Sequence, residues 1–510
     1  MSDTSQNNKR IVKNTLFLYI RMFFIMAITL FTSRVVLSTL GVVDFGIYNV
    51  VGGVVAMMGI LNNAMAVSSQ RYITFELGRG DITRLRQVFS ICFLIFILLS
   101  IIVVILAETI GLWFLNNKMV IPSDRIVATN WVYQFSILSC IASLIVTPFN
   151  ATIIAHERMN VYAYVGIAES LLRLVIVYII LILPSDRLAT YGLLMFLSQC
   201  IVTLMYVFYC TRHFVESRYS FYWERPLFKE LVTYSGWNLF GSVSGLVKGQ
   251  GLNILLNIFF NPAVNAARGI AYQVNTAITQ FFTNFYTAIR PQITIYYAQG
   301  EMGEMIKLIF RSSKFSFFLI LIVSMPILIE TPYIIKLWLG QLPEYVVPFT
   351  RIIIAISAID AMATPLMTAA HATGKIRLYQ SSVGTMTILN VPISYIFLKL
   401  GHSPLIVFYI SLLISLICLF MRLWIVRRLM FFPVKEYVLK VFGNALLISI
   451  ISAILPLYVH MQLDENFMNV VLTCLICLIS CLLSIWFVGL NKNERYFVDE
   501  VVKKKIFHKS

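Results

Sequence analysis

Long apolar segments recur along the whole chain and alternate with short polar segments. Each apolar segment has about 20 residues, the length that an α-helix needs to cross about 30 Å of hydrocarbon. The pattern predicts an all-α polytopic membrane protein with about fourteen transmembrane helices. The predicted spans lie near residues 15–37, 45–68, 89–112, 126–150, 161–183, 189–211, 235–259, 263–289, 313–337, 348–370, 378–399, 404–426, 441–460 and 468–490.

The composition agrees with burial in a bilayer. Of the 510 residues, 59% are hydrophobic and 12% are charged, whereas soluble proteins average about 25% charged residues. The net charge of +17 would favour a nucleic-acid partner in a soluble protein. Here the basic residues gather in alternate loops, so we expect no nucleic-acid partner. The loops are also too short for the globular head of a membrane-tethered enzyme.

The distribution of basic residues predicts the orientation of the helices. Alternate loops are rich in arginine and lysine, including Arg84, Arg212 and Arg427, whereas the intervening loops hold few basic residues, such as Lys118 and Lys336. Basic loops stay on the cytoplasmic side of the membrane during insertion. We therefore expect both termini to lie in the cytoplasm, with the first span acting as an uncleaved signal anchor.

Three groups of residues occur twice in the same order, about 220 residues apart, which indicates an internal repeat. The first copies are Ile73-Thr74 with Gly80-Asp81, Glu108-Thr109 with Leu112-Trp113, and Pro148 with Arg158 and Tyr162. The second copies are Ile293-Thr294 with Gly300-Glu301, Glu330-Thr331 with Leu337-Trp338, and Pro365 with Lys375 and Tyr379.

The offset corresponds to six helices and their loops, and six helices return the chain to its starting side. The sequence therefore predicts two parallel six-helix repeats around a central cavity, related by an axis along the membrane normal. The predicted parts are an N-terminal bundle (1–230), a C-terminal bundle (231–430), and two additional helices with a basic cytoplasmic tail (431–510).

Two short segments carry a family resemblance. Arg34 is followed by Leu40-Gly41-Val42-Val43-Asp44-Phe45-Gly46-Ile47-Tyr48, and a later loop runs from Gln70-Arg71-Tyr72 through Gly78-Arg79-Gly80-Asp81. With the chain length and the repeat, these segments resemble the Wzx-type polysaccharide flippases of the multidrug/oligosaccharidyl-lipid/polysaccharide exporter superfamily. The resemblance covers the whole chain, including two last helices that drug-exporting relatives usually lack.

The resemblance implies a transport function in the bacterial cell inner membrane. Its members move an undecaprenyl-pyrophosphate-linked oligosaccharide, an O-antigen or capsule/exopolysaccharide repeat unit, from the cytoplasmic to the periplasmic leaflet by alternating access. The partners it implies are this lipid-linked substrate, membrane lipids, and the polymerase and glycosyltransferases of polysaccharide and lipopolysaccharide biosynthesis. It implies a flippase rather than an enzyme, so we expect no catalytic residues.

The eighth span carries a polar stripe. Its residues Arg268, Tyr272, Asn275, Thr279 and Tyr286 are spaced so that they share one face of a helix. A polar face of this length favours a water-filled cavity over lipid. The alternative is that Arg268 extends along the helix to the headgroups.

Other charged residues in the spans also require an explanation, because each costs about 2.5–3.5 kcal/mol at the bilayer centre. Lys248 in the seventh span is a candidate contact for a pyrophosphate or an anionic sugar, although the glycines around it also suit helix packing. Embedded bases outnumber embedded acids, as an anionic cargo requires. The bases assigned to the cavity are Arg34, Arg173, Lys248 and Arg268, and the acids are Glu169 and Asp360.

The embedded acids are candidates for coupling or gating. Glu169 and Arg173 are four residues apart, so they are expected to form an ion pair that is either structural or a gate. Asp360 could be a packed neutral carboxyl, part of a salt bridge between helices, or a site that couples transport to a proton or sodium ion. Asp44 could form an outer gate with Arg34.

Metal sites and other cofactors are not expected. The three neighbouring cysteines Cys474, Cys477 and Cys481 have no histidine or acidic residue beside them in their span, so packing explains them better than metal binding. Two other functions remain open. A cation-coupled multidrug exporter of the same fold would favour an acidic, aromatic cavity, and a membrane-embedded polysaccharide polymerase or ligase would need a substantial periplasmic loop.

The predicted orientation can be tested with reporter fusions. Fusions after Ser217 and Ser510 should report a cytoplasmic position, and a fusion after Gln341 should report a periplasmic one, because the basic loops remain inside. Alkaline phosphatase and green fluorescent protein, which are active on opposite sides of the inner membrane, give the measurement. A cytoplasmic signal at Gln341 would contradict the helix count in the second half.

Overall fold

The computed structural model describes residues 2–117, 121–182, 186–260, 262–464, 466–492 and 494–495. In this part of the chain the secondary structure is helical throughout, without β-strands. The helices of the first half are α1 (Ser2–Arg79), α2 (Ile82–Leu106), η1 (Ala107–Gly111), α3 (Leu112–Asn117), η2 (Ser123–Arg125), α4 (Ile126–Ala155), α5 (Met159–Ile182), α6 (Arg187–His213) and η3 (Val215–Ser217). Those of the second half are α7 (Arg225–Phe259), α8 (Pro262–Ala298), α9 (Met302–Ile329), α10 (Thr331–Leu339), α11 (Val346–Ala372), α12 (Arg377–Lys399), α13 (Leu405–Met430), α14 (Val434–Tyr437), η4 (Val438–Gly443), α15 (Asn444–Gln462), α16 (Phe467–Ser484) and η5 (Ile485–Gly489).

The lengths of the helices confirm a polytopic membrane protein. Among the described residues, 11 helical segments are long and apolar enough to cross a bilayer. The remaining predicted spans lie in the second part of α1, in α7 and in α8. The helices α7 and α8 have 35 and 37 residues, so length does not limit them, but they carry more polar side chains than the other spans.

A kink at Gly41 divides α1 into two helices. Gly41 has φ 78° and ψ 169°, a conformation outside the helical region. Side chains other than glycine rarely adopt such a positive φ, so the residue type permits the bend. The kink lies inside the Leu40–Tyr48 motif and separates the first two predicted spans.

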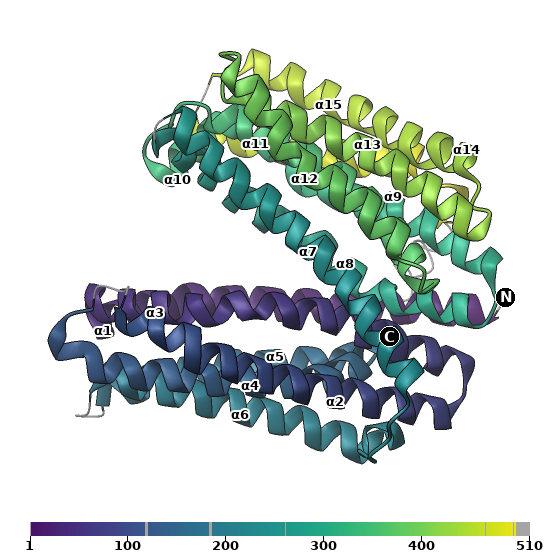
Figure 1. Ribbon diagram of the computed structural model, residues 1–510. Coiled ribbons are helices and arrows are strands. Elements are labelled where there is room, and N and C mark those ends of the chain that lie inside the picture. The colour runs from purple at the N-terminus through teal and green to yellow at the C-terminus, as the bar shows by residue number, and fades with distance from the viewer. Residues whose placement is uncertain are drawn as a thin grey trace, which may run out of the picture. The chain divides into compact units, whose positions relative to one another are not determined.

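The chain forms two compact units. One contains residues 10–242, and the other contains 243–510 with the first nine residues. The boundary falls inside α7, which continues across it as one helix. In the first unit, α4 packs against α2, α5 and α6, as Figure 1 also shows. The predicted division of the chain at residues 230 and 430 stays a prediction.

The two units repeat one packing arrangement. In the first unit α4 packs against α2 and α6, and α5 packs against α6. In the second unit α11 packs against α9 and α13, and α12 packs against α13. Helices with the same order in each half therefore make the same neighbours, which is the arrangement that the internal repeat predicted.

The same turn also occurs in both halves. Gly80 follows α1 with φ 77°, and Gly300 follows α8 with φ 78°. Each glycine N–H donates to a carbonyl of the preceding helix, to Glu76 O at 3.1 Å and to Tyr297 O at 3.1 Å. The next helix starts within two residues, so these left-handed glycines act as helix C-caps that reverse the chain.

The C-terminal helices pack against α9 of the second unit. Both α15 and α16 contact α9 and each other. Two polar side-chain contacts reinforce this packing: Lys314 Nζ donates to Glu494 Oε2 at 2.8 Å, and His460 Nδ1 lies 2.8 Å from Glu330 Oε1. Glu330 is only 2% exposed, so His460 supplies a polar partner that the carboxylate requires when it is removed from water.

Substitutions at the two turns test the C-cap role. Gly80→Ala and Gly300→Ala should each lower the free energy of unfolding by about 1 kcal/mol, because a Cβ is disfavoured at positive φ. Gly303→Ala is a suitable control, because Gly303 lies in α9 and no atom outside its own helix lies within 4 Å of an added Cβ. Thermal unfolding of the purified proteins in detergent gives the comparison. An equal loss in all three variants would contradict the conformational explanation.

Candidate functional site

Helix α8 of the second unit carries polar side chains along one exposed face. Tyr272, Gln273, Thr276, Gln280 and Thr283 are exposed. Tyr272, Thr276, Gln280 and Thr283 are spaced by three or four residues, and Gln273 lies next to Tyr272, so all five lie on one side of the helix over about 15 Å. The opposite side is buried and apolar, with the residues Val264, Ala267, Ala271 and Ile278. Within a bilayer an exposed amide-rich face is costly against lipid, so this face indicates a water-filled space.

The hydroxyl groups on this face are oriented by their own helix. Thr276 Oγ1 donates to Tyr272 O at 2.8 Å, and Thr283 Oγ1 donates to Thr279 O at 2.8 Å. Each hydroxyl hydrogen is therefore satisfied locally, while the oxygen lone pairs remain available as acceptors. The amide groups of Gln273 and Gln280 add donors. The face can therefore both donate hydrogen bonds to a ligand and accept them from it.

Arg268 lies at one end of α8 and is held by neutral groups of α7. Its guanidinium donates to Gly249 O at 2.8 Å and to Asn253 Oδ1 at 3.2 Å. The same group lies over the Tyr272 ring, 4.6 Å from its centroid. These partners orient the guanidinium without neutralising it. The remaining charge suits an anion, which would form charge-assisted hydrogen bonds with the fork.

The other predicted residues of the stripe differ in their surroundings. Asn275 is half-buried, and its buried Oδ1 accepts no hydrogen bond from the described residues. Thr279 is half-buried and donates to Thr276 O at 3.2 Å. Tyr286 turns to α11, where its hydroxyl contacts Thr368. The predicted stripe is therefore polar along its length, but at its C-terminal end Tyr286 packs against α11 of the same unit.

Lys248 lies half-buried on α7. The ion pairs that the described residues form do not include it. Its role as a headgroup contact stays a prediction.

Asp360 of α11 is paired with Arg422 of α13. Arg422 Nη1 lies 3.5 Å from Asp360 Oδ1, Ser415 Oγ donates to the same oxygen at 3.1 Å, and Arg422 Nε donates to Tyr379 Oη at 3.0 Å. The Arg422 side chain is 16% exposed, whereas that of Asp360 is 46% exposed. The contact is the salt bridge between helices that was one of three alternatives, and a coupling role stays a prediction.

In the first unit, the predicted gating acids Glu169 and Asp44 each form an ion pair. Arg173 Nη2 donates to Glu169 Oε1 at 2.6 Å, which is the ion pair expected from their spacing. Asp44 is buried and pairs with Arg125, which also binds Asp186 at 2.7 Å. The side chain of Arg34 lies outside the described part of the structure, so its predicted contact with Asp44 stays a prediction.

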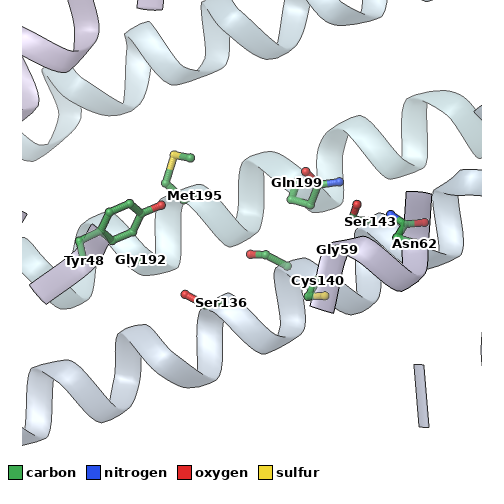
Figure 2. A pocket seen from close by; sticks show the side chains of 10 residues that line it. Tyr48, Gly59, Asn62, Ser136, Cys140, Ser143, Gly192, Met195 and Gln199 are labelled. Atoms are coloured by element: carbon green, nitrogen blue, oxygen red, sulfur yellow. The ribbon is translucent and has the colours of Figure 1, made fainter. Parts of the chain in front are cut away.

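The first unit also holds a cavity of about 300 Å³ between α1, α4 and α6. Figure 2 shows its lining: six of the ten described lining residues carry a hydroxyl or amide group, and none of the ten carries a formal charge. The polar members are Tyr48, Asn62, Ser136, Ser139, Ser143 and Gln199. Asn62 Oδ1 accepts a hydrogen bond from Thr147 at 2.9 Å. This volume is at the lower end of the range of small-molecule sites.

Several of these residues were not anticipated from the sequence. Arg422 lies inside a predicted span and could have been identified as a cation that requires a buried partner. The three serines of the cavity occur at positions i, i+3 and i+7 of α4, which places them on one helix face. Arg125 was assigned to an outer loop, and no local pattern indicated its partners Asp44 and Asp186.

Comparison with known proteins identifies the fold. The sequence matches no family model, and no curated protein matches it significantly. Solved structures do match it. A MATE transporter in complex with MaD3S has a TM-score of 0.71 at 13% identity, covering 83% of this chain and 97% of its own. An outward-facing MATE family transporter of the MOP superfamily gives 0.71 at 14% identity, covering 84% and 97%.

The fold is that of a MATE transporter. A third structure with this fold is a MOP superfamily transporter from Pyrococcus furiosus, for which a binding pocket of reverse polarity is said to suggest a different function. It has a TM-score of 0.63 at 15% identity and covers 83% of this chain and 96% of its own. At these identities the similarity shows the MATE fold alone. With the apolar helices, it supports a multi-pass membrane protein.

The Asp360–Arg422 contact can be tested by paired substitutions. Asp360→Asn should lower stability by about 2 kcal/mol, because it leaves the largely buried Arg422 without its carboxylate. Adding Arg422→Gln should restore part of this loss, because the unpaired charge is then removed. The measurement is the melting temperature and the amount of protein in the membrane. A stable Asp360→Asn protein that has lost gradient-driven export would instead support coupling at Asp360.

Proposed function

We propose that this protein is a flippase that moves an undecaprenyl-pyrophosphate-linked oligosaccharide from the cytoplasmic to the periplasmic leaflet of the bacterial inner membrane. The observation that supports it most directly is the α8 face, where the uncompensated Arg268 adjoins a row of amides and hydroxyls. This combination suits a substrate with an anionic phosphate group and neutral sugars. The MATE fold agrees with transport as the general function.

The charge of the site suits the pyrophosphate. The described partners of Arg268 are two neutral oxygens and a tyrosine ring, so binding an anion does not require a carboxylate to leave. A guanidinium can give a phosphate two parallel hydrogen bonds. Lys248 on α7 would add a second, more mobile point charge.

The neutral part of the site suits sugars. Sugar hydroxyls both donate and accept hydrogen bonds, so they require partners of both kinds. Side-chain amides and hydroxyls meet this requirement on α8, and the cavity in the first unit offers the same chemistry through Asn62, Gln199 and three serines. An uncharged lining also permits different sugars. A hydroxyl group, whether on the protein or on the sugar, can act as either donor or acceptor, so several arrangements of sugar hydroxyls can be satisfied. The polyprenyl chain would remain in lipid, which dissolves it without a protein site.

A multidrug exporter of the same fold is the second candidate. Solved structures of MATE transporters, including one of a multidrug resistance family member, share the fold, and fold similarity favours this function at least as much as the flippase. A cationic drug would require acidic or aromatic partners. Asp360, the predicted coupling acid of the second unit, is paired with Arg422. The local charge therefore favours an anionic substrate.

Substitution of Arg268 tests the proposed function. Removing a charge-assisted contact costs about 1.5–3 kcal/mol, or one to two decades in affinity. Arg268→Ala should therefore reduce export strongly, and Arg268→Glu should abolish it through repulsion of the phosphate. Arg268→Lys should keep only part of the activity. The positive charge remains, but lysine cannot give the two parallel hydrogen bonds of a guanidinium group. The measurements are surface polysaccharide and the amount of protein in the membrane.

A control at Arg351 separates charge reversal at the site from charge reversal in general. Arg351 is exposed and also donates to a backbone carbonyl, Leu328 O at 3.0 Å. Arg351→Glu should leave polysaccharide export near the wild-type level. Resistance to cationic drugs should be unchanged in all of these variants. Normal polysaccharide from a well-expressed Arg268→Glu protein, or loss of drug resistance alone, would contradict the proposal.

A further inference from the structure

A large groove lies at the end of α13, where the chain turns into α14 and η4. It encloses about 1260 Å³ and belongs entirely to the second unit. Its lining combines basic and large apolar side chains, among them Trp424, Arg427, Arg428, Phe431, Lys435 and Leu439. No residue of the α8 face contributes to this lining. The groove is therefore a separate site from the proposed substrate surface.

The basic residues of the groove are not neutralised by the rest of the described chain. Arg427, Arg428 and Lys435 are exposed and take part in none of the ion pairs that the described residues form. The nearby Glu436 pairs instead with Lys440, at 2.6 Å. Three cations around one hollow attract a ligand with more than one negative charge, and arginine favours phosphate in particular.

The groove also presents exposed apolar residues, and Phe431 is the most exposed of the large apolar side chains described. Phe431 is 97% exposed, Leu439 69% and Trp424 54%, and the Arg428 guanidinium lies 5.8 Å from the centroid of the Trp424 ring. Tryptophan beside basic residues at the end of a transmembrane helix is typical of the headgroup region. Apolar side chains in this region meet acyl chains, while the bases meet phosphates.

The backbone holds Phe431 in this position. Phe431 is the C-cap of α13, with φ 53° and ψ 39°, a left-handed conformation that is rare for a bulky residue. Its N–H donates to Arg427 O at 3.0 Å and closes the helix. The turn directs an aromatic ring away from the protein beside two arginines. An aromatic ring in this position can pack against the acyl chains of a lipid.

We propose that this groove binds a phospholipid of the surrounding membrane whose headgroup carries two separate phosphate groups, as in cardiolipin. Two phosphates would lie among Arg427, Arg428 and Lys435, and the acyl chains would pass over Phe431 and Leu439. Basic pockets between transmembrane helices bind such headgroups in other membrane proteins. This site is independent of the proposed substrate, because it concerns a bulk lipid and a different surface.

Titration of the detergent-purified full-length protein with cardiolipin, followed by native mass spectrometry, tests the proposal. Each basic residue near a lipid surface contributes about a fivefold change in affinity, so the combined variant Arg427→Gln/Arg428→Gln/Lys435→Gln should bind cardiolipin roughly 100-fold more weakly. The control Arg86→Gln/Lys229→Gln/Lys375→Gln removes the same charge elsewhere and should bind as the wild type does. Phosphatidylethanolamine, without net charge, should bind weakly to every protein.

Several outcomes would overturn the proposal. These are unchanged affinity in the groove variant, an equal loss in the control variant, or equal binding of phosphatidylethanolamine and cardiolipin. Displacement of cardiolipin by an equal concentration of undecaprenyl pyrophosphate would assign the groove to the substrate lipid instead. If the combined variant does not reach the membrane, Arg427→Gln and Lys435→Gln alone should each lose about fivefold, and unchanged affinity in both would overturn the proposal.

Discussion

Hydrocarbon offers no hydrogen bonds, and this constraint governs every polar group in the spans of this protein. Backbone groups satisfy it through helices, and several buried side chains satisfy it through partners. Asp360 pairs with Arg422, Glu330 with His460, and Lys314 with Glu494. A polar side chain that is neither buried nor paired must face water. The exposed amides of α8 therefore indicate where the protein contains an aqueous path.

The same constraint explains why helix ends are so similar in the two units. A chain that leaves the membrane as a helix must satisfy its last carbonyl groups before it turns back. Gly80 and Gly300 do this with nearly the same φ, and a new helix follows each within two residues. Duplication of a bundle would preserve such turns, because a wrong residue at positive φ would cost stability in each copy.

Charge distinguishes the functions that this fold can carry. The MATE fold is shared with multidrug transporters, so the fold does not choose between cationic drugs and an anionic lipid-linked sugar. The local environment of each charge is more informative. Arg268 is held by neutral oxygens and keeps its charge for a ligand, whereas Asp360 is compensated by Arg422 and held by Ser415. Arg268 therefore has no acidic partner among the described residues, whereas Asp360 has a basic one.

The sequence by itself determined the helices and their repeat, because hydropathy and helical spacing are local properties. It placed Arg268 on a polar face and predicted the Glu169–Arg173 contact, since residues four apart meet on one helix. It did not reveal Arg422 beside Asp360, Arg125 beside Asp44, or the serine-lined cavity. Those contacts join residues more than 50 positions apart on different helices. Only the packing of the helices decides which side chains meet, so only the tertiary structure could establish them.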